Sequence, residues 1–272
     1  MSIAPVRERV LDPKRYHASF LHSVRSELRK LTNLRSFWIQ SAAMVIIYDL
    51  IMWGVGASQG YVNTESGFTI PLNAQVITTG ISFVIIFPIV IGAGAVTNEY
   101  SSNTMRTTAL ADSSRTRSYF SKLTAIGIYT GALNLLVTLT SALVYMLIVG
   151  GSWHFGGGNG RALVMFWLVL TVGAVMAASL GYIIRSTAAT ITVSMLFLFV
   201  SQGIVIINLD WVRDTLIHFM PVNVITAATS TELWNALTGG PELSWSQAGI
   251  VWVLYAVVVG ILGLVRYQRS DI

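Results

Sequence analysis

Six long apolar stretches alternate with polar, charged segments along the chain. A helix of about 20 apolar residues is long enough to cross a hydrocarbon core of about 30 Å, and every stretch reaches that length. The pattern therefore predicts an all-α, polytopic membrane protein with six transmembrane helices. The predicted spans are Phe37–Ala57, Gln75–Thr97, Leu123–Val149, Ala162–Ile184, Thr187–Ile207 and Trp245–Val265.

A shorter helix is predicted before the first span. Apolar residues recur at spacings of three and four from Phe20 to Leu34, and Glu27, Arg29 and Lys30 lie between them. This periodicity is typical of an amphipathic helix with a basic face, which lies in the headgroup region of a membrane. Such a helix can anchor the topology or contact a partner, and the sequence leaves both roles open.

The segment 208–244, before the last span, is too apolar for a solvated loop and too interrupted to cross the membrane. Pro221, Gly239, Gly240 and Pro241 punctuate its apolar residues. Backbone at membrane depth must satisfy its hydrogen bonds within the protein. We therefore predict a re-entrant helical hairpin on the external side.

The basic residues are distributed asymmetrically between the predicted spans. Of the 17 Lys and Arg residues, 15 lie before span one, between spans two and three, between spans four and five, or after span six. The other three loops hold only Arg161 and Arg213. Because cytoplasmic loops carry the excess of Lys and Arg, we expect both termini in the cytoplasm. The expected location is the cell membrane, as a multi-pass protein of the plasma or bacterial inner membrane.

Composition narrows the functional classes further. Hydrophobic residues make up 54% of the chain and charged residues only 11%, with a formal net charge of +5. In a membrane protein this charge faces anionic lipid, so we expect no nucleic-acid partner. The chain has no cysteine and only scattered histidines, so we expect no catalytic residue and no metal site. It reads as one membrane domain over residues 1–272.

A few side chains within the spans are candidates for a substrate pathway. Asp49 is the one formal charge inside a predicted span, and such residues are often functional. The alternative is that Asp49 pairs with a polar neighbour and serves packing alone. The aromatic residues suit an apolar or amphipathic cargo. The candidate pathway residues are Asp49, Phe83, Phe87, Asn134, Phe197 and Gln202.

The cytoplasmic loop 98–122 is long and carries charges of both signs. Loops of this length usually form structure of their own or serve a function. Met105, Ala109 and Leu110 have helical spacing, which favours a short helix on the cytoplasmic face.

The cytoplasmic segments resemble those of the permease subunit of an ABC exporter of the six-span ABC-2 class. The resemblance covers the topology of the whole chain, but its residue-level match is confined to two segments. Asn103 stands where that family often has Gly, and Ser113-Ser114 precede Arg115 where a Pro is common. The matching residues are Ser26-Glu27-Leu28-Arg29-Lys30-Leu31, Arg35-Ser36, Trp38, Asn98-Glu99-Tyr100, Thr104, Arg106, Thr107, Arg115 and Lys122.

The resemblance implies that the loop 98–122 contains a coupling helix that binds a cytoplasmic ABC ATPase, present in two copies. ATP and Mg²⁺ would bind to that partner, so this chain would be a permease and not an enzyme, with no cofactor of its own. A second permease chain, identical or a paralogue, would complete the pathway for a drug, peptide or lipid. The implied ATPase contacts are Glu99, Tyr100, Thr104, Met105, Arg106, Thr107 and Arg115.

The residues also allow two other functions to be considered, a secondary transporter and an intramembrane enzyme. A secondary transporter could use Asp49 as a proton carrier, although a single buried acid is weak support. An intramembrane enzyme needs convergent polar groups at one depth, and the spans offer few. The glycine run 156–158 lacks the Lys-Ser or Lys-Thr of a phosphate-binding loop, so any ATP would have to bind elsewhere.

Overall fold

The computed structural model describes most of the chain as a bundle of helices. Within its described residues there is no strand, which confirms the all-α prediction for this part of the chain. The described ranges are 19–66, 73–102, 104–105, 114–150, 156–204, 215–232, 235–236 and 243–269.

The helices occur close to where the hydropathy pattern predicts them, and the long ones extend beyond the predicted spans. The bounds are α1 (Phe20–Asn33), α2 (Arg35–Ser66), α3 (Ala74–Thr79), α4 (Ile81–Val84), α5 (Ile86–Ser101), α7 (Arg115–Val149), α8 (Asn159–Ile184), α9 (Thr187–Ile204), η2 (Leu216–Phe219), α11 (Pro221–Thr229) and α13 (Trp245–Gln268).

Five segments of the described chain are long and apolar enough to cross a membrane, which supports a multi-pass membrane protein. They correspond to five of the six predicted spans. The remaining predicted span, Thr187–Ile207, forms α9. The apolar part found in this helix, Thr187–Phe199, is shorter than the five segments. A sixth crossing therefore stays a prediction. The five segments are Arg35–Gln59, Ile81–Ser101, Arg115–Val149, Asn159–Ile184 and Trp245–Gln268.

The second predicted span, Gln75–Thr97, is not one continuous helix. It is divided into α3, α4 and α5 at Gly80 and Ile85. Pro88 has no N–H to donate to the carbonyl of Val84, so the hydrogen-bond ladder is interrupted where α4 ends. At Gly80 a Cβ would lie 2.8 Å from the ring of Tyr48, so only glycine leaves room for that tyrosine. Tyr48 in turn donates to the carbonyl of Ile77 and fixes α3.

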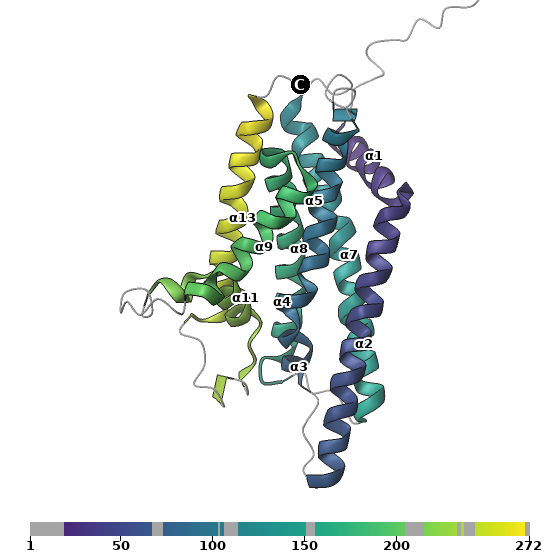
Figure 1. The fold of residues 1–272 in the computed structure, drawn as a ribbon, viewed down its shortest axis with the longest axis vertical. Coiled ribbons are helices and arrows are strands. Elements are labelled where there is room, and N and C mark those ends of the chain that lie inside the picture. The colour runs from purple at the N-terminus through teal and green to yellow at the C-terminus, as the bar shows by residue number, and fades with distance from the viewer. Residues whose placement is uncertain are drawn as a thin grey trace, which may run out of the picture.

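The long helices run roughly along one axis, and α8 occupies the middle of the bundle (Figure 1). It packs against α5, α7, α9 and α13, while α2 lies along α7 on one side. The short helix α1 crosses the end of the bundle where α5 and α13 finish and α7 begins (Figure 1). One end of the bundle therefore gathers the helix ends that carry most of the described basic residues.

The segment before the last span is described only in part. The helix α11 packs against α8, α9 and α13, and its residues Val224, Ile225 and Ala228 are fully buried. Short helices in this region agree with the expected character of the segment. Residues 205–214, 233–234 and 237–242 lie outside the described residues, so the re-entrant hairpin stays a prediction.

A very close approach between two helices involves Gly92 on α5. A Cβ built there would lie 2.1 Å from the carbonyl oxygen of Ala174 on α8. Lipid is as apolar as the helix surfaces, so helices in membranes associate through close packing of small residues. Gly92 thus determines how tightly α5 can pack against the central helix.

We predict that Gly92→Ala lowers the stability of the folded protein by about 1 to 3 kcal/mol, because the methyl group cannot fit without separating the two backbones. Thermal unfolding in detergent measures the effect. The matched control is Gly54→Ala on α2, where a Cβ meets nothing within 4 Å. That exchange should be neutral or stabilising by up to about 1 kcal/mol, since alanine is the better helix former. Equal unfolding temperatures for the two variants would contradict this packing.

Candidate functional site

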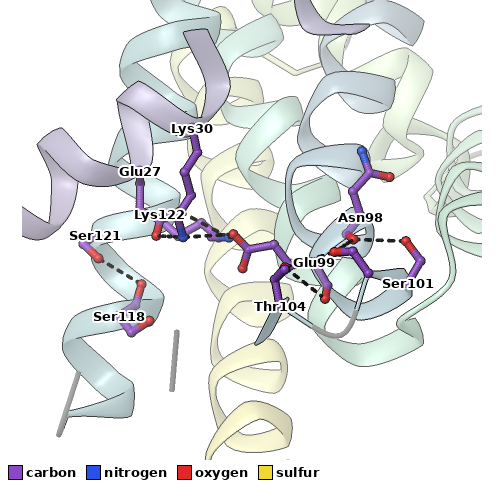
Figure 2. Close-up of polar contacts among 10 residues, drawn as sticks. Glu27, Lys30, Asn98, Glu99, Ser101, Thr104, Ser118, Ser121 and Lys122 are labelled. Carbon is purple, nitrogen blue, oxygen red and sulfur yellow. Dashed lines mark hydrogen bonds and ion pairs between the residues drawn. The ribbon is translucent and has the colours of Figure 1, made fainter. Parts of the chain in front are cut away.

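Four charged side chains from three helices meet at the basic end of the bundle. Lys122 of α7 lies 2.6 Å from Glu99 of α5 and 3.2 Å from Glu27 of α1. Lys30 of α1 lies 2.6 Å from Glu27 and 3.1 Å from Glu99. Figure 2 shows Glu27 and Lys30 of α1 and Lys122 of α7 gathered around Glu99 of α5. We call these four residues the ionic cluster.

The ionic cluster is largely removed from solvent. Only 4% of the Lys122 side chain is exposed, against 10% for Glu27, 13% for Glu99 and 40% for Lys30. A buried charge is costly unless it is paired and hydrogen-bonded, and here each ammonium meets two carboxylates. The cluster therefore holds α1, α5 and α7 in one fixed arrangement.

The position of Glu27 follows from the amphipathic character of α1. Val24, Glu27 and Leu31 share the buried face of this helix, which packs against α7. Ser19 caps its start by accepting from the backbone N–H of His22. The apolar neighbours press α1 onto α7 and carry Glu27 to Lys122. The helix forms where the sequence predicts it, but its carboxylate faces inward.

The pKa of Lys30 reflects this environment. Partial burial disfavours its charged form, yet the hydrogen bonds and opposite charges of Glu27 and Glu99 outweigh that effect and raise the pKa above its ordinary value. A raised lysine pKa means that the pairing stabilises the fold at neutral pH. The contribution is lost only as the pH rises through the alkaline range of that pKa.

A groove opens beside the ionic cluster. Its volume is about 740 Å³, and its walls come from α1, the start of α2, α5 and α7. Charged and amide groups line it together with the apolar side chains of Leu34, Phe37 and Ile126. The groove is thus suited to an amphipathic partner at the mouth of the bundle, next to the point where the chain leaves α5.

Aromatic side chains stabilise the same end of the bundle. The Tyr182 ring lies 4.8 Å from the Tyr119 ring and 5.0 Å from the Tyr267 ring. The centre of the Tyr100 ring lies 6.4 Å from that of Tyr182. The guanidinium of Arg185 lies 5.3 Å from the centre of the Tyr100 ring. These contacts join α5, α7, α8 and α13, so the basic end is a packed unit and not a set of independent loops.

The residues expected to contact an ATPase lie at this end wherever the structure describes them. Glu99 belongs to the ionic cluster, and Tyr100 packs in the tyrosine group. Thr104 is exposed, whereas Met105 is buried at 3% exposure. The Arg115 guanidinium donates to the carbonyl of Gln268 over 2.9 Å and to that of Tyr267, so it caps α13.

Some of the expected contact residues lie outside the described part of the chain. Arg106 and Thr107 lie outside the described residues, as do Ala109 and Leu110 of the expected short helix. Of the expected interfacial residues, Glu27 and Lys30 belong to the ionic cluster, and Arg29 is exposed.

The candidate pathway residues do not gather into one site. Asp49 on α2 accepts hydrogen bonds from Thr140 at 3.1 Å and Ser141 at 2.9 Å, both on α7. This pairing fits the packing role that the sequence left open. Asn134 on α7 instead donates to Thr171 on α8 over 3.1 Å. These two polar residues therefore serve different helix pairs.

The aromatic candidates are also spread over the bundle. Phe83 on α4 is 69% exposed at the outer surface. Phe197 on α9 contacts Tyr255 with ring centres 5.5 Å apart, and Phe87 is partly buried on α5. Gln202 lies on α9, and its side chain is outside the described part of the structure. A shared pathway through these residues stays a prediction.

Sequence reasoning missed Lys122 as the centre of the site. From the sequence, Lys122 was expected only at the end of the loop 98–122, as a basic residue before the third span and a match to the permease family, whereas α7 begins seven residues earlier, at Arg115. Lys122 therefore lies inside a candidate membrane helix and is 3% exposed. A lysine preceding an apolar run could have prompted a search for acids at the same depth, which Glu27 and Glu99 provide.

The ionic cluster predicts unequal effects for its two lysines. Lys122→Met should lower stability by about 3 to 5 kcal/mol, because it leaves Glu27 and Glu99 without their buried partner. Lys30→Met removes a half-exposed partner and should cost about 1 kcal/mol or less. Unfolding by heat or by denaturing detergent in mild micelles compares the variants. Comparable losses for both would show that burial does not govern the cluster.

The comparison with protein families identifies one family. No curated protein matches the chain. Residues 42–272 match the family described as Protein of unknown function (DUF2705). The match starts within α2 and takes in α5 and α7, so it includes Glu99 and Lys122, while α1 precedes it. The chain belongs to this family, DUF2705.

Proposed function

We propose that this protein is the membrane-spanning permease subunit of an ATP-driven exporter and is driven by a separate cytoplasmic ABC ATPase. The observation that carries the proposal is the groove at the basic end, with the ionic cluster in its wall. The proposed cargo is apolar or amphipathic. A second permease chain and two ATPase subunits would complete the assembly, with both termini of this chain in the cytoplasm.

The charge distribution supports placing the groove on the cytoplasmic side. Described basic residues on α1, α7, α13 and the end of α8 lie at this end, and Arg161 is the described basic residue at the other. Cytoplasmic segments of membrane proteins carry such an excess. An ATPase that hydrolyses cytoplasmic ATP would therefore meet the groove and the segment between Ser102 and Ser114.

The ionic cluster supports a way to transmit force. A push on the segment that joins α5 to α7 acts on the ends of both helices, which the cluster ties to α1. The close packing at Gly92 couples α5 further to the central helix α8. Rigid-body movement of such a unit is one of the known modes of switching. ATP can drive it only if the two states of the permease differ in affinity for the closed ATPase pair.

The proton-coupled alternative has weaker support. Asp49 is held by two hydroxyl donors of α7, and the described residues contain no group of three or more His, Cys, Asp or Glu side chains close together. A proton relay uses chains of such groups. The groove and the ionic cluster, in contrast, lie where a cytoplasmic motor would act.

We predict that the full chain, purified from its native membranes in mild detergent, carries an ATPase subunit with Mg²⁺-dependent ATP hydrolysis. Arg106→Glu should reduce that activity and the amount of bound ATPase by about ten-fold, since a reversed charge at a docked surface opposes association. Glu99→Lys is a poorer probe because it also unbalances the buried ionic cluster.

The matched control is Arg269→Glu, an exposed residue at the same end of the molecule that directly follows α13. It should keep both the ATPase and the activity. An unfolding temperature equal to that of the wild type establishes that each variant is folded. A wild-type preparation without an ATPase, or an Arg106→Glu protein that retains it in full, would refute the proposal.

A further inference from the structure

We propose that the protein holds one anionic phospholipid at a defined site, with its phosphate on Arg25 and Arg29 and one acyl chain in a groove between α1, α2 and α7. The inference does not depend on transport or on an ATPase. It rests on two neighbouring surfaces of α1, one apolar and one basic.

The apolar groove has a volume of about 630 Å³. Its lining residues come from three helices. They include Leu28 of α1, Val45 and Ile46 of α2, and Ile128 and Leu136 of α7. Ser41 and Tyr129 hydrogen-bond to each other at 2.9 Å between the two helices. Because the two hydroxyl groups hydrogen-bond to each other, they need no partner in the groove. The remaining surface is apolar, and an acyl chain can cover it.

The groove lies at the depth expected for a lipid close to its headgroup. Trp38 lines it and donates its indole N–H to the carbonyl of Thr32 over 2.7 Å. Tryptophan is enriched where membrane meets water. The groove therefore starts at the interface and extends down α2 and α7 toward the hydrocarbon.

A basic depression of about 400 Å³ adjoins the groove on α1. Arg25 and Arg29 line it one helical turn apart. Leu28 and Thr32 of the groove follow these arginines by three positions and are therefore their neighbours on the helix surface. Both arginines are exposed, and no hydrogen bond or ion pair of theirs occurs within the described residues. Lys30 is occupied by the carboxylates of the ionic cluster.

Charge complementarity selects the occupant. Arginine matches phosphate with paired donors, and clusters of basic residues attract anionic lipid. A second copy of this chain would fit less well, because the acids of the described chain at this end, Glu27 and Glu99, are already paired. A phospholipid of the adjacent leaflet supplies both the anion and the apolar chain.

Native mass spectrometry of the delipidated full chain with added phosphatidylglycerol or phosphatidylcholine tests the proposal. The wild type should bind phosphatidylglycerol about ten-fold more tightly, and Arg25→Gln with Arg29→Gln should remove that preference. The double exchange of Arg266 and Arg269 to Gln removes two exposed charges at the same end and should keep it.

A separate variant tests the binding of the acyl chain in the apolar groove. Ala132 is exposed in the groove, so Ala132→Trp fills the space without entering the core and should lower binding of both lipids by about ten-fold. Val258→Trp, on an exposed face of α13, is the control and should bind as the wild type does.

Three outcomes would overturn the proposal. Equal binding of the two lipids to the wild type would exclude headgroup recognition. Loss of the preference in the Arg266 and Arg269 variant would show diffuse attraction and not a site. Unchanged lipid binding by Ala132→Trp, accompanied by a change from dimer to monomer in solution, would assign the groove to a second copy.

Discussion

Lys122 is a buried lysine inside an apolar helix, and its charge requires that other helices supply carboxylates next to it. A buried ammonium is tolerated only where opposite charges meet it, and here they come from α1 and α5. None of these three helices can move away without exposing an unpaired charge. The arrangement of the basic end, and the groove within it, depend on this one requirement.

A second constraint acts along the length of the bundle. Within a bilayer the packing of small residues holds helices together, and the approach of α5 to α8 at Gly92 is of this kind. The central helix is similarly close to α13, where a Cβ at Gly263 would lie 2.8 Å from the carbonyl of Ser179. Charge pairing at the end and glycine contacts in the middle together make α5, α7, α8 and α13 one mechanical unit.

Hydropathy predicted most of this fold because the length and apolar character of a membrane helix are local properties. The five long spans and the helix at Phe20–Asn33 follow from them directly. The division of the second span was less accessible, since Pro88 and Gly80 permit a break but the position of Tyr48 decides it.

The candidate site was predicted only in part. The resemblance directed attention to Glu99 and α1, but an acid at the membrane surface is ordinarily solvated. Its pairing with Lys122 and Lys30 depends on residues 23 and 69 positions away in sequence, which no local pattern shows. Asp49 was found readily because it is a charge within a span. Its hydroxyl partners on α7 emerged only from the packing of α2 against that helix.

The central claim is that the end of the bundle that carries the ionic cluster faces the cytoplasm. Because the chain contains no cysteine, a single introduced cysteine can be labelled without background. Ser102→Cys at this end and Gly156→Cys at the other are both exposed positions. In intact cells a membrane-impermeant maleimide should label only Gly156→Cys, and Ser102→Cys should react only after the membrane is opened. Labelling of Ser102→Cys from outside intact cells would contradict the account.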